Sequence, residues 1–230
     1  MSQSNLYVDI GHSAVKWRTH DSEVFSQSVD KFSEKSLPDT QSIWLSAVAH
    51  QEIVKAIEME FTDVEVVKSL SHFGSLTIAY KEPLDLGSDR FLAMLGALKY
   101  FPHRNLLIID VGSALTIDVV NDSGEHLGGL IMPGLEAIRG SFAKFATNSQ
   151  NLNLSSLQTS TEEAWLSGTK AMFISTIKEQ ITGFEFEQQD GIVILTGGGV
   201  SKLLSELPET VNYFNNLVLD GLESYSKSMG

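Results

Sequence analysis

The sequence predicts an α/β fold made of two related halves, and three features of the chain carry that prediction. An acidic turn motif occurs twice, as Asp9-Ile10-Gly11-His12-Ser13 and as Asp110-Val111-Gly112-Ser113-Ala114. Each copy directly follows a short apolar run, which is typical of a buried strand. Each copy then leads into an alternating or β-branched run that ends at a polar turn. We therefore expect strand, tight turn, strand, turn, strand in both halves, with the two halves facing one nucleotide.

The remaining elements follow from hydrophobic periodicity and from residues that start or stop helices. Short apolar runs predict buried strands at residues 5–8, 42–48, 106–109 and 191–195. Apolar residues at helical spacing predict helices at residues 51–61, 88–101, 135–146, 160–183 and 200–207. Ser88 is suited to cap the second helix, and Pro208 ends the last one.

The connecting segments indicate how the chain divides into domains. A polar loop is expected at residues 147–160. The segment from Pro102 to Asn105 interrupts the pattern between the two copies of the repeat. We therefore expect an N-terminal domain over residues 1–103 and a C-terminal domain over residues 104–230.

Composition restricts the partners of this chain. Its 29 acidic and 16 basic residues give a formal net charge of −13, with 42% hydrophobic residues overall. A globular chain of that charge repels a phosphate polymer, so no nucleic-acid partner is expected. A small phosphorylated ligand is not excluded, because a few backbone N–H groups, a cation and one lysine can neutralise it.

The sequence also indicates the compartment. It contains no cysteine, which excludes disulfides, thiolate metal sites and a cysteine nucleophile, and which suits a reducing environment. The first residues do not resemble a secretory leader, and no apolar run approaches the ~20 residues of a membrane span. We expect a cytoplasmic protein without a membrane partner.

The two Asp-x-Gly turns are the strongest candidates for a chemical site. Glycine has no Cβ and accepts positive φ, so such a turn can offer backbone N–H groups to phosphate oxygens at close range. The aspartate beside it can hold a cation, directly or through water. A single copy is better explained as an ordinary turn between two strands, but two copies in the same context favour phosphate binding.

Other common site signatures are missing from the sequence. Neither the P-loop pattern nor the Gly-x-Gly-x-x-Gly fingerprint occurs. The six histidines are scattered without ligand spacing, so we expect them on the surface or in turns rather than around a metal ion.

Six motifs, taken in order, resemble those of type III pantothenate kinases, which belong to the superfamily of acetate and sugar kinases, actin and chaperone ATPases. The motifs cover nearly the whole chain and read Asp9-Ile10-Gly11-x-Ser13 with Lys16, Tyr80-x-x-Pro83-x-x-Leu86-Gly87-x-Asp89-Arg90, Asp110-x-Gly112-Ser113-Ala114-x-Thr116-x-Asp118, Gly128-Gly129-x-Ile131-x-Pro133-Gly134, Thr161-x-x-Ala164-x-x-x-Gly168 and Thr196-Gly197-Gly198. The resemblance implies two ribonuclease-H-like α/β domains with a cleft between them. It also implies that ATP phosphorylates pantothenate to 4'-phosphopantothenate, the first step of coenzyme A biosynthesis.

The resemblance further implies a role for each matching residue. The ATP-binding positions would be Asp9, Ile10, Gly11, His12, Ser13, Ala14, Val15, Lys16, Ser113, Gly197 and Gly198. The substrate-binding positions would be Tyr80, Gly87, Ser88, Asp89, Arg90 and Thr161, with Asp89 as the catalytic base. Asp110 would hold a monovalent cation, K⁺ or NH₄⁺, and Mg²⁺ would accompany ATP.

The family also completes its substrate site between subunits, which implies a homodimer. The apolar helix at residues 89–101 is a candidate interface. The same apolar stripe fits an ordinary core contact equally well.

Local sequence leaves alternatives open at several of these positions. Asp89 lies at a helix start, where the helix dipole favours the carboxylate, but Ser88-Asp89 could also be a simple capping pair. Arg90 suits an anionic substrate group, although a surface arginine is commoner. Thr161 could be an N-cap, and the glycines from Gly197 onward could form a plain loop or admit an adenine ring.

Two positions depart from the family pattern. His12 stands where an asparagine is usual, which places a larger, titratable ring in the first turn. Ser113 replaces a threonine and keeps the hydroxyl. A non-enzymatic accessory regulator of the same fold therefore stays open as an alternative, as does a kinase of another small hydroxylated substrate.

Overall fold

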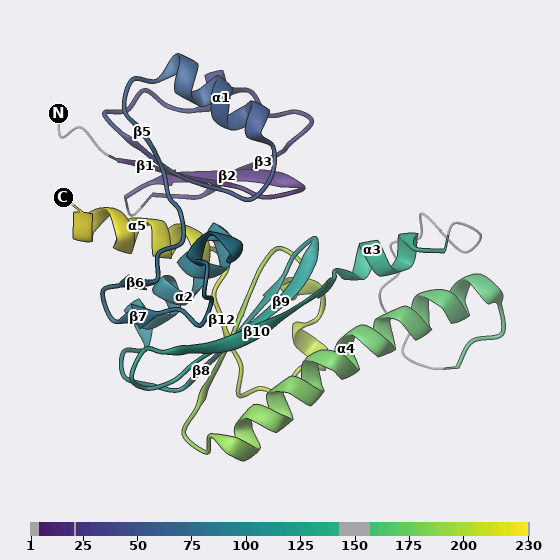
Figure 1. Cartoon of the computed structure of the whole chain (residues 1–230). Helices are drawn as coiled ribbons and strands as arrows, with labels where there is room; N and C mark the ends of the chain where they lie inside the picture. The colour runs from purple at the N-terminus through teal and green to yellow at the C-terminus, as the bar shows by residue number, and fades with distance from the viewer. Residues whose placement is uncertain (1–4, 21, 143–156, 230) are drawn as a thin grey trace. The chain divides into compact units, whose positions relative to one another are not determined.

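The computed structural model describes residues 5–20, 22–142 and 157–229, and the chain forms two compact units (Figure 1). The first unit comprises Met1–His103, Ser123–Gly128 and Asn216–Gly230, and the second comprises Arg104–Asp122 and Gly129–Asn215. The sequence predicted one domain boundary after residue 103. The structure differs from that prediction, because residues 123–128 and 216–230 belong to the first unit.

A five-stranded sheet forms the centre of the first unit. Its strands are β1 (Leu6–Ile10), β2 (Ala14–Thr19), β3 (Phe25–Ser28), β4 (Ile43–Ala47) and β5 (Val64–Val66), in the spatial order β3-β2-β1-β4-β5. The sheet is antiparallel from β3 to β1 and parallel from β1 to β5. The helices of this unit are α1 (Gln51–Glu60), α2 (Ser88–Tyr100) and α5 (Leu217–Met229), and a small hairpin joins β6 (His72–Phe73) to β7 (Leu76–Thr77).

Alternation along β1 sends successive side chains to opposite faces of this sheet. Leu6, Val8 and Ile10 belong to a core cluster that includes the buried side of α1. Tyr7 points the other way, and its hydroxyl accepts a hydrogen bond from Ser226 of α5 at 3.1 Å. Figure 1 shows α1 and α5 on opposite sides of the sheet. Asp9 therefore lies on the α5 side.

The second unit repeats this architecture. Its sheet contains β8 (Leu106–Val111), β9 (Ala114–Val120), β10 (His126–Pro133), β11 (Ile192–Thr196) and β12 (Asn212–Tyr213), in the order β10-β9-β8-β11-β12. Counted along the chain, both sheets have the order 3-2-1-4-5. The predicted strand and turn pattern of the repeat is thus confirmed, as is the α/β fold of two ribonuclease-H-like domains.

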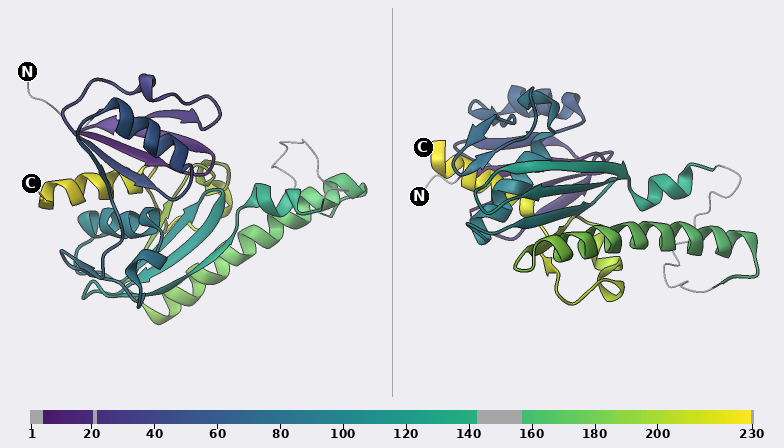
Figure 2. Two further views of the ribbon diagram at one scale, coloured as in Figure 1. Left: turned by 45° about the horizontal axis from the view of Figure 1, so that its top comes forward. Right: turned by 60° about the horizontal axis from the view of Figure 1, so that its bottom comes forward.

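One long helix covers a face of the second sheet. Leu107, Ile109 and Val111 of β8 form a core cluster with Ile177 and Ile181 of α4 (Thr161–Glu187). Figure 2 shows α4 running across this sheet. Asp110 alternates with these core residues, so it lies on the face away from α4.

Several predicted elements have different bounds in the structure. Helix α3 (Leu135–Gly140) is shorter than predicted and ends at a glycine, a poor helix former. Residues 143–156 lie outside the described residues. They include the last part of the helix predicted at residues 135–146 and most of the predicted loop. The segment at residues 200–207 forms two 3₁₀ turns, Val200–Lys202 and Leu204–Glu206, instead of one helix. Within the described ranges, no helix has the length and apolar character that crossing a membrane requires.

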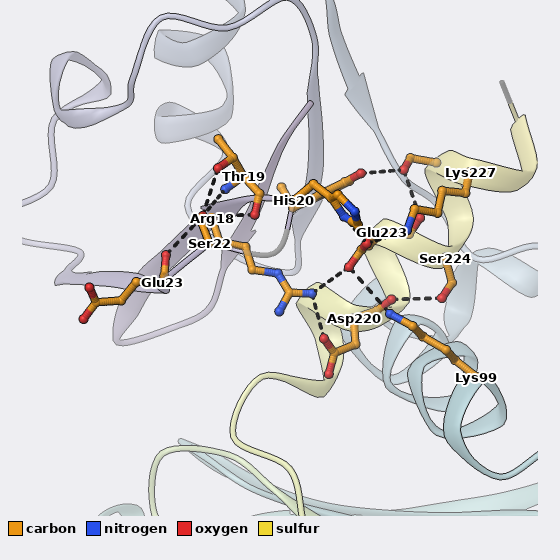
Figure 3. Close-up of polar contacts among 12 residues, drawn as sticks. Arg18, Thr19, His20, Ser22, Glu23, Lys99, Asp220, Glu223, Ser224 and Lys227 are labelled. Carbon is orange, nitrogen blue, oxygen red and sulfur yellow. Dashed lines mark hydrogen bonds and ion pairs between the residues drawn. The ribbon is translucent and has the colours of Figure 1, made fainter. Parts of the chain in front are cut away.

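Within the first unit, a cluster of charged side chains links α5 to β2 and α2 (Figure 3). The Glu223 carboxylate, only 3% exposed, lies 3.0 Å from Arg18 Nη2 and 2.6 Å from Lys227 Nζ. Arg18 also donates to Asp220 at 2.7 Å, and Lys99 of α2 lies 3.6 Å from Glu223. Because these charges come from β2, α2 and α5, the cluster joins three elements that are far apart in the sequence.

Candidate active site

The first acidic turn connects β1 to β2. The backbone N–H of Gly11 donates to the carbonyl of Ala14 at 3.0 Å, which leaves His12 and Ser13 at the exposed tip. In the register of the two strands, Asp9 is directly opposite Lys16. Directly opposed residues share a face of the sheet, so the two side chains start from adjacent positions on that face.

On its other side, Asp9 is next to Ser46, a residue that contacts the start of α2. Asp9 is paired with Ser46 on the parallel strand β4. The Ser46 hydroxyl is buried and lies 3.3 Å from the Ser88 hydroxyl. Ser88 is the first residue of α2 and Asp89 is the second. The structure therefore brings the first acidic turn and Asp89 to the same face of one sheet.

Backbone geometry holds the Asp89 carboxylate at the helix start. Asp89 Oδ1 accepts a hydrogen bond from the Arg90 N–H at 2.7 Å. A Cβ at Gly87 would lie 2.6 Å from the same oxygen, so a larger residue there would displace the carboxylate from this position. The prediction that Ser88 caps this helix is wrong, because Gly87 occupies the N-cap and the Ser88 hydroxyl contacts Ser46 instead.

Arg90, Tyr80 and His126 form a stack beside Asp89. The Arg90 side chain is buried, and its Nη1 donates to the Tyr80 hydroxyl at 3.0 Å. The His126 ring lies parallel to the Tyr80 ring, with centroids 6.0 Å apart and an interplanar angle of 10°. Its Nδ1 accepts the Ala79 N–H at 3.4 Å. Arg90 is therefore not the surface arginine that local sequence allowed.

His126 is the residue of this site that sequence reasoning missed. We expected every histidine on the surface or in a turn, but His126 is 3% exposed. A single histidine after a glycine turn gives no spacing signal, and its partner Tyr80 lies far away in the sequence. Only tertiary contacts could have revealed it.

The second acidic turn is one residue shorter than the first. The Gly112 N–H donates to the Ala114 carbonyl at 2.9 Å, with Ser113 between them, and both Gly112 and Ser113 are exposed. The Ser113 carbonyl accepts the Gly134 N–H at 3.0 Å. The Pro-Gly motif that follows β10 therefore holds this turn in place.

Two threonines flank Asp110. Its partner on β9 is Thr116, and its partner on β11 is Thr196. In the first unit, Asp9 is flanked in the same way by Lys16 and Ser46. The equivalent aspartates thus have different neighbours: a cation and a hydroxyl for Asp9, and two hydroxyls for Asp110.

Gly197 makes room for Asp110. It has φ of +98°, and a Cβ at this position would overlap Asp110 Oδ1 and the Val111 carbonyl oxygen. A Cβ at Gly198, by contrast, would meet no described atom within 4 Å. The Gly197 backbone therefore packs closely against a carboxylate oxygen and a carbonyl oxygen, which are ligand types that hard cations prefer. In the described part of the chain, no group of three or more His, Cys, Asp or Glu side chains could hold a metal ion.

Thr161 is the first residue of α4 and is exposed. The N-cap interpretation of Thr161 is wrong, because Ser160 is the cap and accepts the Glu163 N–H at 3.3 Å. The Thr161 hydroxyl is therefore not used to start the helix.

Comparisons with known proteins identify the family. A model of the family described as type III pantothenate kinase matches residues 5–183. The chain belongs to the type III pantothenate kinase family. A type III pantothenate kinase from Alcanivorax borkumensis is 31% identical over 95% of this chain and 96% of its own length. One from Hahella chejuensis is 30% identical over 94% of both chains.

Solved structures agree on the fold. A Baf family protein from Campylobacter jejuni has a TM-score of 0.66 at 22% identity, covering 96% of this chain and 97% of its own. The activator of 2-hydroxyisocaproyl-CoA dehydratase from Clostridium difficile, with bound ADPNP, has a TM-score of 0.53 at 13% identity, covering 98% and 96%. At such identities the likeness concerns the fold alone.

Proposed function

We propose that this type III pantothenate kinase family member transfers the γ-phosphoryl group of ATP to the terminal hydroxyl of pantothenate, forming 4'-phosphopantothenate for coenzyme A biosynthesis. The observation that carries the proposal is the link from Asp9 through Ser46 and Ser88 to Asp89. It joins a turn suited to phosphate with a carboxylate suited to a hydroxyl, on one face of one sheet. Phosphoryl transfer requires this combination of neutralised charge and an oriented acceptor.

The first turn binds phosphate through its backbone N–H groups, and Lys16 supplies a positive charge beside it. Ser113, Gly197 and Gly198 are the other positions that we propose for nucleotide contact. Asp89 accepts a hydrogen bond from the substrate hydroxyl, orients it for attack and takes up its proton. The Arg90 guanidinium, backed by Tyr80, pairs with the substrate carboxylate. The Thr161 hydroxyl forms a hydrogen bond with the substrate.

The oxygens around the two aspartates fit the proposed cations. Asp110, the Thr116 and Thr196 positions and the Val111 carbonyl offer oxygen ligands for K⁺ or NH₄⁺, and the absence of a side chain at Gly197 lets its backbone approach Asp110 and Val111 closely. Asp9 is suited to Mg²⁺, directly or through water. When bound with ATP, Mg²⁺ would neutralise charge on the phosphates.

A cytoplasmic homodimer is the proposed state of the protein, as in the family. The apolar stripe of α2 is a poor candidate for the subunit interface. Its residues are buried inside the first unit, where the Gly96 and Leu92 backbones pack closely on α5. The interpretation of this stripe as a core contact is therefore favoured.

Family membership favours a kinase over the accessory regulator, and the buried Arg90 and Tyr80 pair favours an anionic acceptor over a neutral sugar. The test is ADP release from ATP and Mg²⁺ with pantothenate or sugar acceptors, in K⁺ and in Na⁺. We expect release only with pantothenate, and faster release in K⁺. Release with a sugar alone would assign another substrate, and no release under any condition would favour the regulator.

A further inference from the structure

His50 is the residue that precedes α1, and its ring reaches the first acidic turn. His50 Nε2 lies 3.0 Å from the carbonyl oxygen of His12, at the tip of that turn. His50 Nδ1 lies 3.0 Å from Glu52 Oε1, in the first turn of α1. The ring therefore bridges the helix and the turn.

The chemistry of the two partners favours the charged form of this ring. A carbonyl and a carboxylate only accept hydrogen bonds, and a neutral imidazole has a single N–H to offer. The imidazolium has two and satisfies both partners. Accordingly, the hydrogen bond to the His12 carbonyl and the one to Glu52 raise the pKa of His50 above its ordinary value of 6.5.

The backbone conformation of His50 is one that disfavours a side chain, which indicates a specific role for the imidazole ring. His50 adopts φ of 56° and ψ of 53°, a left-handed conformation that glycine would take more easily. Its side chain is 28% exposed and that of Glu52 is 74% exposed. Ion pairs at such exposure add little stability. A contribution to stability alone is therefore a weak explanation for histidine, rather than glycine, at this position.

We propose that His50 is a positioning residue for the nucleotide: by holding the His12 carbonyl it aims the backbone N–H groups of the first turn at the phosphates of ATP. The inference rests on the proposed function of this turn. It also explains how the turn keeps its shape with His12 where the family pattern has asparagine, since the hydrogen bond fixes the main chain rather than the side chain.

The first experiment compares two glycine substitutions at left-handed histidines. His50→Gly removes the ring while suiting the backbone, so the thermal midpoint should stay equal or rise. His103→Gly is the matched control, because His103 is exposed and has φ of 57°. The dissociation constant of AMPPNP, measured by calorimetry, should rise about three- to tenfold in His50→Gly, the effect of one lost hydrogen bond. It should stay unchanged in His103→Gly.

The second experiment follows the same dissociation constant against pH. Two titratable residues flank the ring, Glu52 from α1 and His12 from the turn. The bridge is complete below the raised pKa of His50 and weakens as the pH rises through it, so AMPPNP binding should weaken in that range. His50→Gly supplies the pH dependence of AMPPNP binding in the absence of the ring. In Glu52→Gln the change should move to lower pH, because the negative charge that helps to raise the pKa is gone.

The outcomes separate this inference from the proposed function. Equal AMPPNP affinity in the wild type and His50→Gly, or an equal loss in His103→Gly, would overturn the positioning role. A wild type that binds AMPPNP without releasing ADP in the presence of pantothenate would overturn the kinase proposal while the affinity comparison still decides the role of His50. A wild type that binds no AMPPNP would overturn both.

Discussion

Asp89 occupies the second position of α2, where the helix dipole and the Arg90 N–H both stabilise its carboxylate. In the proposed reaction, Asp89 would both orient the acceptor hydroxyl and take up its proton.

Replacing Asp89 by asparagine should therefore remove most turnover without unfolding the protein. The side-chain amide would keep the shape and the acceptor for the Arg90 N–H but could not take a proton. We expect kcat to fall about 10²- to 10⁴-fold, with the thermal midpoint nearly unchanged. Asp85→Asn, which alters an exposed carboxylate four residues earlier, is the matched control. Unchanged ADP release in Asp89→Asn would exclude Asp89 from catalysis.

Gly197 and Gly198 offer a second pair of matched substitutions. Gly197→Ala forces a Cβ into Asp110 and requires a strained positive φ, so we expect a loss of about 1–3 kcal/mol in stability. We also expect a marked rise in the K⁺ concentration needed for half-maximal activity. Gly198→Ala should be nearly neutral in both measurements, since its Cβ meets open space. Equal effects of the two changes would mean that Gly197 does not shape the cation site.

At this scale the sequence predicted some residues and could not predict others. The acidic turns and the Asp89 region were recognisable because backbone chemistry requires glycine and aspartate at fixed offsets. His126 and His50 were not recognisable, because their importance comes from partners that are distant in sequence or from a backbone carbonyl.

Among the elements, α5 carries a buried carboxylate, Glu223, that is paired with several cations. Burial alone would raise the pKa of Glu223, but the hydrogen bond from Lys227 and the charges of Lys99 and Arg18 outweigh burial and lower the pKa to about 2. A carboxylate with a lowered pKa stabilises the folded state above its ordinary value of 4.5. That contribution is lost as the pH falls from about 4.5 toward 2.

Glu223→Gln should remove this pH dependence. Relative to wild type it should lose on the order of 3 kcal/mol at neutral pH, and its thermal midpoint should fall less between pH 4.5 and 2. Glu58→Gln, at an exposed position on α1, makes the same change of charge outside the cluster. Thermal unfolding across pH checks both variants, and parallel curves for wild type and Glu223→Gln would contradict the assignment.

Helix α2 and the strands of both repeats were predictable from periodicity, whereas the position of α5 was not. Its contacts join Arg18 to Asp220 and Tyr7 to Ser226, across the whole length of the chain. Local patterns carry no information about such pairs. The cap of α2 was mispredicted for a related reason, since Ser46, far along the chain, engages the Ser88 hydroxyl.

For the whole molecule, the repeated turn had the greatest predictive value. Two copies of one motif implied two halves, and the two sheets share one strand order. The halves have nevertheless diverged at equivalent positions. Asp9 has Lys16 and Ser46 as neighbours and suits phosphate, whereas Asp110 has Thr116 and Thr196 and suits a cation.

The most direct test of the central claim is the identity of the product. The purified protein is incubated with ATP, Mg²⁺, K⁺ and pantothenate, and the mixture is read by mass spectrometry and phosphorus NMR, with Asp89→Asn in parallel. The account predicts that the wild type converts pantothenate to a phosphomonoester on its terminal hydroxyl and that Asp89→Asn forms little of it. ATP consumption that leaves pantothenate unmodified would contradict the account.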